Sequence, residues 1–434
     1  LGVALSARGA GEESRGLAAG NGMPLSLSPD AHQEYLRALL RAPIVTILYL
    51  ALWGIAVFFI KTTLHIDLFG TVLARPSPPL VNGRLPGSSL SLPPAPSPRT
   101  ILLSALALLG TLLWSFLVWC GLLHGSVEGA IFAFYVAIPF ILVVLPVVGF
   151  GRGNIFPYIR TLRRVLWPSA EENVPFVEVF VADAMTSLSK VFADTGLVLA
   201  VLVSRAVAFD VNNTQFLSKP TAQLVSTVVS GCLPPFLACM PYIIRVRQLV
   251  VLRLWSEDGD ERWQHAMNVI KYLFNFPTIW LAAWLATLPE APAPPMAAYH
   301  EAGSWATMDG GPGDVLVHGE ALRLSIMRAV LEEAVVFCSL SSLFLSFIWD
   351  VRMDWGLAQT ATVRQCCLRD TLLFRSQWIY YSGICGNLIL RLANTYIGLT
   401  GHVPAFLSRI DAAFVMEVLE ILRRTLWCVF RIEW

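Results

Sequence analysis

Three long stretches without a charged residue constrain this chain more than any other feature. They run from Pro43 to Ile60, from Ile101 to Leu123 and from Ala130 to Gly151. A helix that crosses the hydrocarbon core of a bilayer, about 30 Å thick, needs about 20 mainly apolar residues. Each stretch is long enough to do so. We therefore predict that the chain is embedded in a membrane.

Six further apolar windows follow, most of them with internal charges, at about 176–204, 221–244, 267–288, 323–349, 376–400 and 411–431. Composition agrees with a membrane protein, because only 14% of the residues are charged, against about 25% in soluble proteins. The net charge of +1 gives no sign of a nucleic-acid partner. We predict an all-α fold, a polytopic membrane helical bundle of about nine to ten transmembrane helices in a lipid bilayer.

Composition also divides the chain into parts. Residues 1–42 form a polar N-terminal segment without a cleavable signal peptide, and the absence of an initial Met favours a fragment. Residues 43–150 hold the first three spans, with a Pro/Ser-rich linker at 62–100. Residues 151–434 hold the other windows and most of the charges within them.

Arginines gather in three of the predicted loops. Positive residues collect on the cytosolic side of membrane proteins, so three groups are predicted to be cytosolic: Arg152, Arg160, Arg163 and Arg164; Arg245, Arg247, Arg253 and Arg262; and Arg352, Arg364, Arg369 and Arg375. The stretch 288–320 has no lysine or arginine, and the loop at 206–220 has only Lys219 and a sequon at Asn212. Both are predicted to be lumenal or external. The same rule leaves the side of the N-terminus open.

Enzyme signatures are missing from the sequence. It contains neither H-E-x-x-H nor G-x-S-x-G, and the glycines at 310–313 are not followed by Lys-Ser/Thr. The eight cysteines show no C-x-x-C spacing. Arg328, Glu332 and Glu333 are interpreted as an intrahelical charge group near a membrane boundary. We therefore predict no catalytic residues, no metal site and no cofactor.

Charged residues within the apolar windows are the candidates for function, because an ionisable group at the bilayer centre costs about 2.5–3.5 kcal/mol and usually faces a cavity or a partner. In the 176–204 window, Asp183, Ser187, Lys190 and Asp194 are spaced 4, 3 and 4 apart. On a continuous helix these positions share one face. Such a face could line a path for ions or simply fix helix packing by ion pairs.

Two later windows each contain one buried cation. Lys271 shares a helical face with Asn268, Asn275 and Thr278. Arg391 lies deep in apolar sequence, with Asn387 one turn before it and Asn394 and Thr395 one turn after it. Because no acid is near Arg391 in the sequence, its guanidinium is expected to need an anion or a partner helix.

The last window places Glu417, Glu420, Arg423, Arg424, Trp427 and Arg431 largely on one side of a helix. Pooling the candidates gives five cations, Lys190, Lys271, Arg391, Arg423 and Arg424, against three acids, Asp183, Asp194 and Glu420. We predict a cavity with a positive surplus. Arginine and lysine in such a cavity would suit an oxyanion such as inorganic phosphate.

Four sequence strings carry a family resemblance. They are V-A-D-A-M-T-S-L from Val181, W-D-V-R-M-D-W-G-L from Trp349, L-R-L-A-N-T from Leu390, and E-I-L-R-R-T-L-W-C-V-F-R-I-E from Glu420. In order and spacing they resemble the EXS domain of phosphate exporters of the xenotropic and polytropic retrovirus receptor type and of the yeast ER-retention-defective protein of the Golgi. The resemblance covers about 150–434, and more loosely the earlier spans.

The resemblance implies a helical bundle that moves inorganic phosphate along a path lined with basic residues. It implies phosphate contact for Lys271, Arg391, Arg423 and Arg424, with Asp183 as a pathway acid and Glu420 as a counter-charge. Lys190 completes the predicted substrate-binding set from the sequence analysis. Asp350 and Asp354 are expected to be structural or gating acids at a cytosolic helix end.

The sequence departs from the exporter pattern at two places. Val251-Leu252 and then Arg253 follow Gln248, where the exporters have consecutive arginines. Asn394 stands where they have an aromatic gate. The exporters also carry an SPX domain, for which 42 residues are too few, so the shorter Golgi type is favoured.

The leading hypothesis is a transporter, not an enzyme, that returns phosphate from the Golgi lumen to the cytosol and so supports glycosylation and glycosyltransferase retention. The plasma membrane or another endomembrane is the alternative location. Beyond phosphate and the lipid bilayer, a homodimer and Golgi glycosyltransferases are the expected partners. The alternative function is a membrane sorting adaptor whose basic loops bind glycosyltransferase tails; it requires loop residues such as Arg364 and Arg369 and not Lys271. A membrane-embedded transferase ranks last.

Overall fold

The computed structural model describes residues 29–63, 65, 97–137, 162–167, 174–213, 218–289, 312–358, 368–369, 371–405 and 410–434. The elements are α2 (Pro29–Thr63), α3 (Pro98–Gly121), α4 (Val127–Ala130), the π-helix η3 (Ile131–Ala137), α7 (Phe176–Thr186), α8 (Ser189–Asn213), α9 (Lys219–Trp255), α10 (Gly259–Leu273), α11 (Asn275–Thr287), α13 (Pro312–Trp349), the π-helix η4 (Asp350–Asp354), α14 (Gln377–Thr400) and α15 (Ala412–Glu433). Within these ranges no strand is present, which confirms the all-α prediction.

Six of the described helices are long and apolar enough to cross a membrane, at Gln33–Thr63, Pro98–Gly121, Ser189–Ala208, Lys219–Trp255, Gly259–Thr287 and Leu322–Asp354. The chain is therefore a polytopic membrane protein. The predicted number of nine to ten is not reached in this part of the chain. The windows 376–400 and 411–431 do form the long helices α14 and α15, but these are not among the six. Most of the window 130–151 lies outside the described residues.

Local sequence explains where several helices begin and end. Ser97 and Ser218 cap α3 and α9 by accepting hydrogen bonds from the backbone N–H groups of Thr100 and Thr221. A proline stands in the first turn of both helices, where its missing N–H costs nothing. Gly401 ends α14 with a φ of +70°, a conformation that glycine adopts without a steric penalty.

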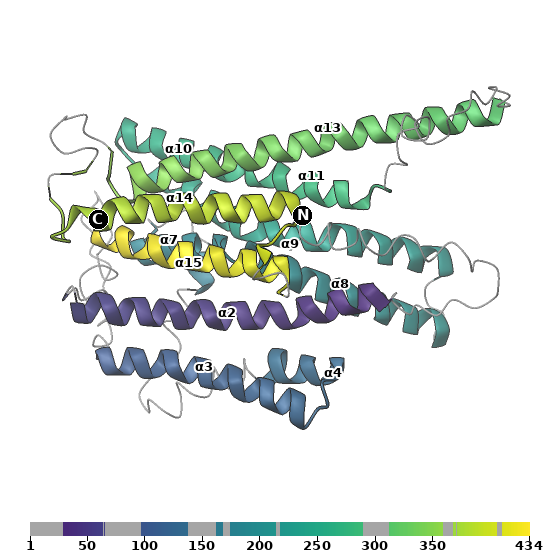
Figure 1. Ribbon diagram of the computed structural model, residues 1–434, viewed down its shortest axis with the longest axis horizontal. Coiled ribbons are helices and arrows are strands. Elements are labelled where there is room, and N and C mark those ends of the chain that lie inside the picture. Colours follow the sequence, from purple (N-terminus) through teal and green to yellow (C-terminus); the bar gives the residue numbers. More distant parts are fainter. Residues whose placement is uncertain are drawn as a thin grey trace.

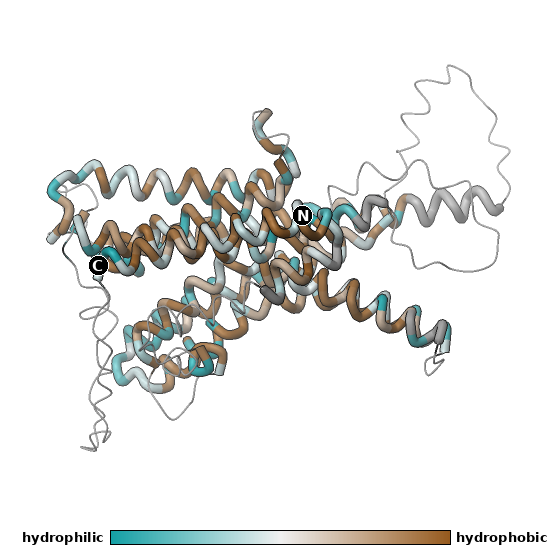
Figure 2. Tube along the Cα trace, turned by 90° about the horizontal axis from the view of Figure 1, so that it is seen from below, coloured by the Kyte–Doolittle hydropathy of each residue, from teal (hydrophilic) through white to brown (hydrophobic). Residues whose placement is uncertain are grey.

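The long helices lie side by side along the longest axis of the molecule (Figure 1). Apolar residues run along most of their length (Figure 2). The helices α2 and α15 run in the same direction, since Arg41 pairs with Asp411 at one end and Ile60 packs in a cluster with Phe430 at the other. The first predicted span is thus part of the bundle.

The second predicted arginine-rich loop is largely helical, since Arg245, Arg247 and Arg253 lie on α9 and Arg262 lies on α10. The described basic segments lie at one end of the bundle, beside the C-terminus (Figure 1). Arg247 stacks on Trp167, with 3.7 Å from its guanidinium carbon to the ring centroid, and Arg369 pairs with Glu433. The chain around 288 lies at the opposite end (Figure 1). This geometry agrees with the predicted alternation of basic and base-poor loops. The sequon at Asn212 and residues Arg152, Arg160 and Arg364 lie outside the described side chains.

The helices α8 and α9 pack closely at Gly196. A Cβ atom at this position would lie 2.7 Å from Pro234 Cα and 3.1 Å from the Leu233 carbonyl oxygen, both backbone atoms. We expect Gly196→Ala to force these helices apart and to lower stability by about 1–3 kcal/mol, measured by thermal unfolding in detergent. Gly110→Ala on α3 is the control, since a Cβ atom at that position would meet nothing within 4 Å. Equal melting temperatures for the two variants would contradict this packing.

Two predicted continuous helices are broken. The 176–204 window divides into α7 and α8 at Ser187 and Leu188, and the 267–288 window divides into α10 and α11 at Phe274. The assumption that Asp183 and Lys190 share one regular helical face was therefore wrong. Non-helical backbone at membrane depth is tolerated where it lines a polar cavity, because its polar groups then find partners. Both breaks occur at such a cavity.

Candidate functional site

A cavity of about 680 Å³ lies among α7 to α11, α13, η4, α14 and α15. It runs from a charged region at the two helix breaks to Thr287, at the end of α11 farthest from the arginine-rich loops. Five basic side chains line it: Lys190, Lys271, Arg391, Arg423 and Arg424. These are the five cations selected from the sequence. The structure brings all of them to one cavity.

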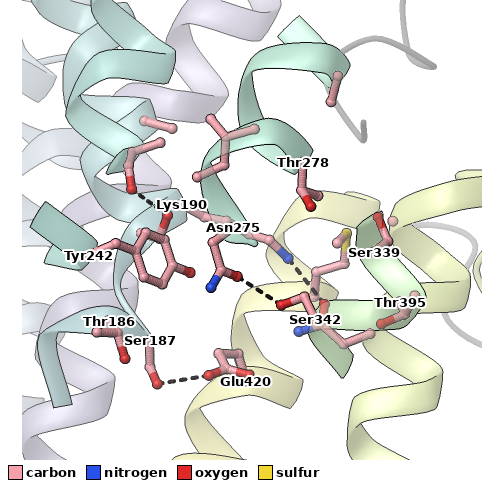
Figure 3. A pocket seen from close by; sticks show the side chains of 18 of the residues that line it. Thr186, Ser187, Lys190, Tyr242, Asn275, Thr278, Ser339, Ser342, Thr395 and Glu420 are labelled. Atoms are coloured by element: carbon pink, nitrogen blue, oxygen red, sulfur yellow. Dashed lines mark hydrogen bonds between the residues drawn. The ribbon is translucent and has the colours of Figure 1, made fainter. Parts of the chain in front are cut away.

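The break between α7 and α8 turns two hydroxyl groups into the cavity. Thr186 and Ser187 both line it, and Ser187 donates a hydrogen bond to Glu420 at 2.7 Å (Figure 3). Arg424 donates to the Ser187 hydroxyl at 2.6 Å and to the Thr186 hydroxyl at 3.0 Å. The broken helix thus positions the α15 arginine.

The π-helical turn η4 supplies two acids to the same cavity, Asp350 and Asp354. Asp350 accepts hydrogen bonds from Arg391 at 2.6 Å, Arg423 at 3.3 Å and Asn387 at 3.1 Å. The sequence analysis expected Arg391 to need an anion or a partner helix, and the acid that meets it lies on η4, far away in the sequence. Asp350 is 41 residues away along the chain, so helical spacing could not reveal the pair.

Arg391 and Arg423 are held by acids but keep donors for other groups. Arg423 forms two bonds with Glu420, at 2.8 Å from Nε and 2.5 Å from Nη2. Arg391 is 14% exposed and uses Nη2 for Asp350. Its buried Nε has no hydrogen-bond partner among the described residues. An unpartnered guanidinium N–H beside a polar cavity is available to an anion, since leaving it unpaired costs about 1–3 kcal/mol.

The other three lining cations, Lys190, Lys271 and Arg424, have no carboxylate within 4.0 Å in the described part of the chain. We call them the unpaired cations. Lys190 Nζ donates to Asn394 Oδ1 at 3.1 Å. Lys271 Nζ lies 4.2 Å from the ring centroid of Tyr272 and 5.1 Å from that of Trp349. Hydroxyls, an amide and aromatic rings orient these charges without neutralising them.

The prediction that more cations than acids line the cavity was wrong. Five acids also line the cavity, namely Asp194, Asp350, Asp354, Glu417 and Glu420, which equals the number of cations. The acids, however, pair partly with arginines outside the lining. Arg41 binds Asp194 at 2.6 Å, and Arg431 lies 3.7 Å from Asp354. The unpaired cations therefore remain uncompensated by direct ion pairs.

Asp183 does not line the cavity, although it is buried beside it. It pairs with Arg245 at 2.5 Å and accepts a hydrogen bond from the Tyr272 hydroxyl at 2.7 Å. In this arrangement Asp183 fixes α7 against α9 and α10 and orients the ring below Lys271. Direct contact of this acid with a transported ion stays a prediction.

Hydroxyl groups and small residues line the rest of the cavity. Thr278, Ser339, Ser342 and Thr395 point into it from α11, α13 and α14 (Figure 3). Ser342 donates to Asn275 Oδ1 at 3.0 Å. An aromatic cluster lies on the other side of the charged region, where Trp427 stacks on Phe180 with 5.7 Å between ring centroids. The cavity is thus lined by hydroxyl groups and small residues toward one end of the bundle and bounded by packed rings toward the other.

Sequence reasoning missed several members of the charged region. Arg41 falls in the predicted polar segment 1–42 and Arg245 in a predicted loop, yet each is only 4% exposed. Glu417 was noted on the last helix but not as a site residue. Arg328 and Glu332 do form the predicted intrahelical pair, at 3.1 Å. The described residues contain no group of three or more His, Cys, Asp or Glu that could hold a metal ion.

Comparison with known proteins gives a consistent family signal. A model described as the EXS family matches residues 36–434. The Protein ERD1 homolog 1 of Schizosaccharomyces pombe is 26% identical over 336 residues, covering 76% of this chain and 75% of the relative. Solute carrier family 53 member 1 of Mus musculus is 26% identical over 262 residues, covering 60% of this chain and 32% of the relative.

A plant relative matches a shorter part. The Phosphate transporter PHO1 homolog 4 of Arabidopsis thaliana is 35% identical over 102 residues, covering 23% of this chain and 13% of the relative. The chain therefore spans about a third of the length of the mouse protein and a smaller share of the plant protein.

Proposed function

We propose, from the premise that this chain belongs to the EXS family, that it moves inorganic phosphate across a membrane. The observation that carries the proposal is the set of three unpaired cations, Lys190, Lys271 and Arg424, in one cavity of a helical bundle. A buried cation is costly in a bilayer unless an anion or a polar cavity compensates it. A relative named as a phosphate transporter adds support for phosphate as that anion.

The cations and acids of the cavity suit a tetrahedral oxyanion that must be bound and then released. Arg391 and Arg423 would donate to phosphate oxygens while Asp350 and Glu420 keep part of their charge compensated. Conduction requires binding that is favourable enough for entry and weak enough for release. Acids beside the arginines serve this purpose, because they compete with phosphate for the same N–H groups. Asp350, Asp354 and Asn394 would thus tune release.

We place the activity in the Golgi membrane, where it would return phosphate from the lumen to the cytosol and so support glycosylation and glycosyltransferase retention. Support comes from the sequence resemblance to the short Golgi type. The match to the fission-yeast relative also covers 76% of this chain. Localisation of the tagged protein against Golgi and plasma-membrane markers tests this placement.

Removal of the Lys271 charge tests transport itself. We expect Lys271→Ala to lower phosphate flux into proteoliposomes by about tenfold or more, because a buried cation–anion contact contributes about 2 kcal/mol or more. Radiolabelled phosphate uptake measures the flux. Arg262→Ala, at an exposed position on the same helix, is the matched control and should retain wild-type flux.

The same pair of variants separates a carrier from a sorting adaptor. An adaptor that binds glycosyltransferase tails through its basic surface would lose partner retention in Arg262→Ala or in a variant of a basic loop residue such as Arg369, and keep it in Lys271→Ala. Wild-type protein without phosphate flux in sealed vesicles would refute the transporter. Unchanged flux in Lys271→Ala would remove this residue from the phosphate path.

A further inference from the structure

Glu417 is the lining residue whose surroundings the phosphate path does not explain. It lies on α15 one turn before Glu420, lines the cavity and is only 3% exposed. Neither of its carboxylate oxygens has a hydrogen-bond partner among the described residues. The other four lining acids all accept at least one hydrogen bond or ion-pair contact within 3.7 Å.

The one cation nearest to Glu417 is already occupied. Arg41 Nε lies 4.0 Å from Glu417 Oε2, but the same guanidinium bonds both oxygens of Asp194 at 2.6 Å and also Asp411. A fourth acid, Glu34, lies 3.8 Å from it. One buried guanidinium therefore faces four carboxyl groups, and Glu417 is the most weakly bound of them.

A buried carboxylate without a donor is strongly unfavourable, and the group becomes neutral by taking a proton. We propose that Glu417 is a proton-binding site in the wall of the phosphate cavity and that its proton is coupled to phosphate binding. The inference rests on the proposed phosphate transport. It adds to it a second transported or exchanged ion, the proton, and names the residue that holds it.

The charged groups that face Glu417 agree with one proton bound among its acids. On α2, Arg41 and Glu34 face the site; on α8, Lys190 and Asp194 do so; Asp411 precedes α15, and Glu420 follows on it. On α14, Asn394 holds Lys190 and Arg391 is bound to Asp350. Lys190 has no direct ion pair with Glu417, since no such contact falls within 4.0 Å in the described chain.

The proton step involves no other chemistry. A hydronium ion in the cavity transfers a proton to one Glu417 oxygen: its O–H bond breaks, an O–H bond forms on the carboxyl group, and a water molecule remains. The reverse step breaks the carboxyl O–H bond and returns the proton to a water molecule as hydronium, without any change of oxidation state. Because Glu417 lines the cavity, the proton has the same access as phosphate.

The sign of the coupling follows from charge. Phosphate bound at Arg423 and Arg424 brings negative charge close to Glu420 and Glu417, on the same helix α15. This charge favours the protonated form of Glu417. By linkage, protonated Glu417 must favour phosphate binding by the same factor. Phosphate transport is thus expected to be stronger at lower pH on the side from which phosphate enters.

Comparison of the wild type with Glu417→Gln tests the site. Glutamine has nearly the shape of the protonated acid and cannot ionise. We expect wild-type phosphate uptake into proteoliposomes to rise, between about pH 8 and about pH 6, about fivefold more than uptake by Glu417→Gln. Phosphate itself titrates in this range, but it does so identically in both samples. Glu333→Gln, an exposed acid on α13, should keep the wild-type pH profile.

The outcomes separate the two proposals. Absence of flux in every sample would refute phosphate transport. Flux with the same pH profile in the wild type and Glu417→Gln would leave transport standing and overturn the proton site. If Glu417→Gln is not monodisperse after purification, infrared difference spectra of the wild type decide the question. A protonated carboxyl band that changes when inorganic phosphate is added near neutral pH supports the site, and no such band overturns it.

Discussion

Arg391→Ala is expected to lower phosphate flux about a hundredfold or more, the largest effect of any single substitution. Arg391 combines a buried Nε without a partner in the described residues and an Nη2 that holds Asp350 at 2.6 Å. Alanine removes the donor for phosphate and leaves Asp350 less compensated. Loss of one partner from a buried charge pair costs about 2–5 kcal/mol. Radiolabelled phosphate uptake into proteoliposomes measures the loss.

A double variant separates the two effects of this substitution. In Arg391→Ala/Asp350→Asn the acid no longer carries a charge, so a purely structural ion pair would be repaired. If Arg391 contacts phosphate, the double variant stays inactive although it elutes as a folded protein on size exclusion. Recovery of most of the flux would show that Arg391 acts only through Asp350.

Arg424→Ala is expected to lower flux about thirtyfold or more, for a different reason. Arg424 is held by the hydroxyls of Ser187 and Thr186 and stacks on Trp427, with 4.6 Å from its guanidinium carbon to the ring centroid. None of these groups neutralises its charge. Loss of this cation removes attraction for an anion without freeing a paired acid. Flux and equilibrium binding of phosphate should therefore fall together.

Arg424→Lys is the matched control that separates the effect of the positive charge from the effect of the guanidinium geometry. Lysine keeps the positive charge but lacks the planar fork that bonds Ser187 and Thr186 together. We expect flux between those of the wild type and Arg424→Ala. Wild-type flux in Arg424→Ala would show that this arginine only joins α15 to the break between α7 and α8.

Much of the site could be predicted from the sequence because bilayer burial is a strict filter. A charge survives in an apolar window only where a partner or a cavity compensates it. Lys190, Lys271, Arg391, Arg423 and Arg424 all pass this filter, and all five line one cavity. The family strings contain three of these positions, Arg391, Arg423 and Arg424, and a match over residues 36–434 confirms the family.

The pairing of these charges could not be predicted from the sequence. Asp350 meets Arg391 across 41 residues, and Arg41 meets Asp194 across 153. Helical spacing reports neighbours three or four residues apart and nothing beyond them. The predicted positive surplus failed partly for this reason, because Asp350 and Asp354 enter the cavity from the π-helical turn η4, which spacing alone does not orient. Glu417 lies on α15 with Glu420, as spacing predicted, but it was left out of the charge count.

The sequence by itself determined that this chain is a membrane-embedded helical bundle with buried cations, since hydropathy and intrahelical spacing are local properties. Tertiary structure alone decided where α7 and α10 end. The end of α7 turned the hydroxyl groups of Thr186 and Ser187 toward Arg424. It also decided which cations stay unpaired and left Glu417 without a donor among the residues that the structure describes. Those features depend on contacts between helices, whose energies arise only once the helices pack against one another.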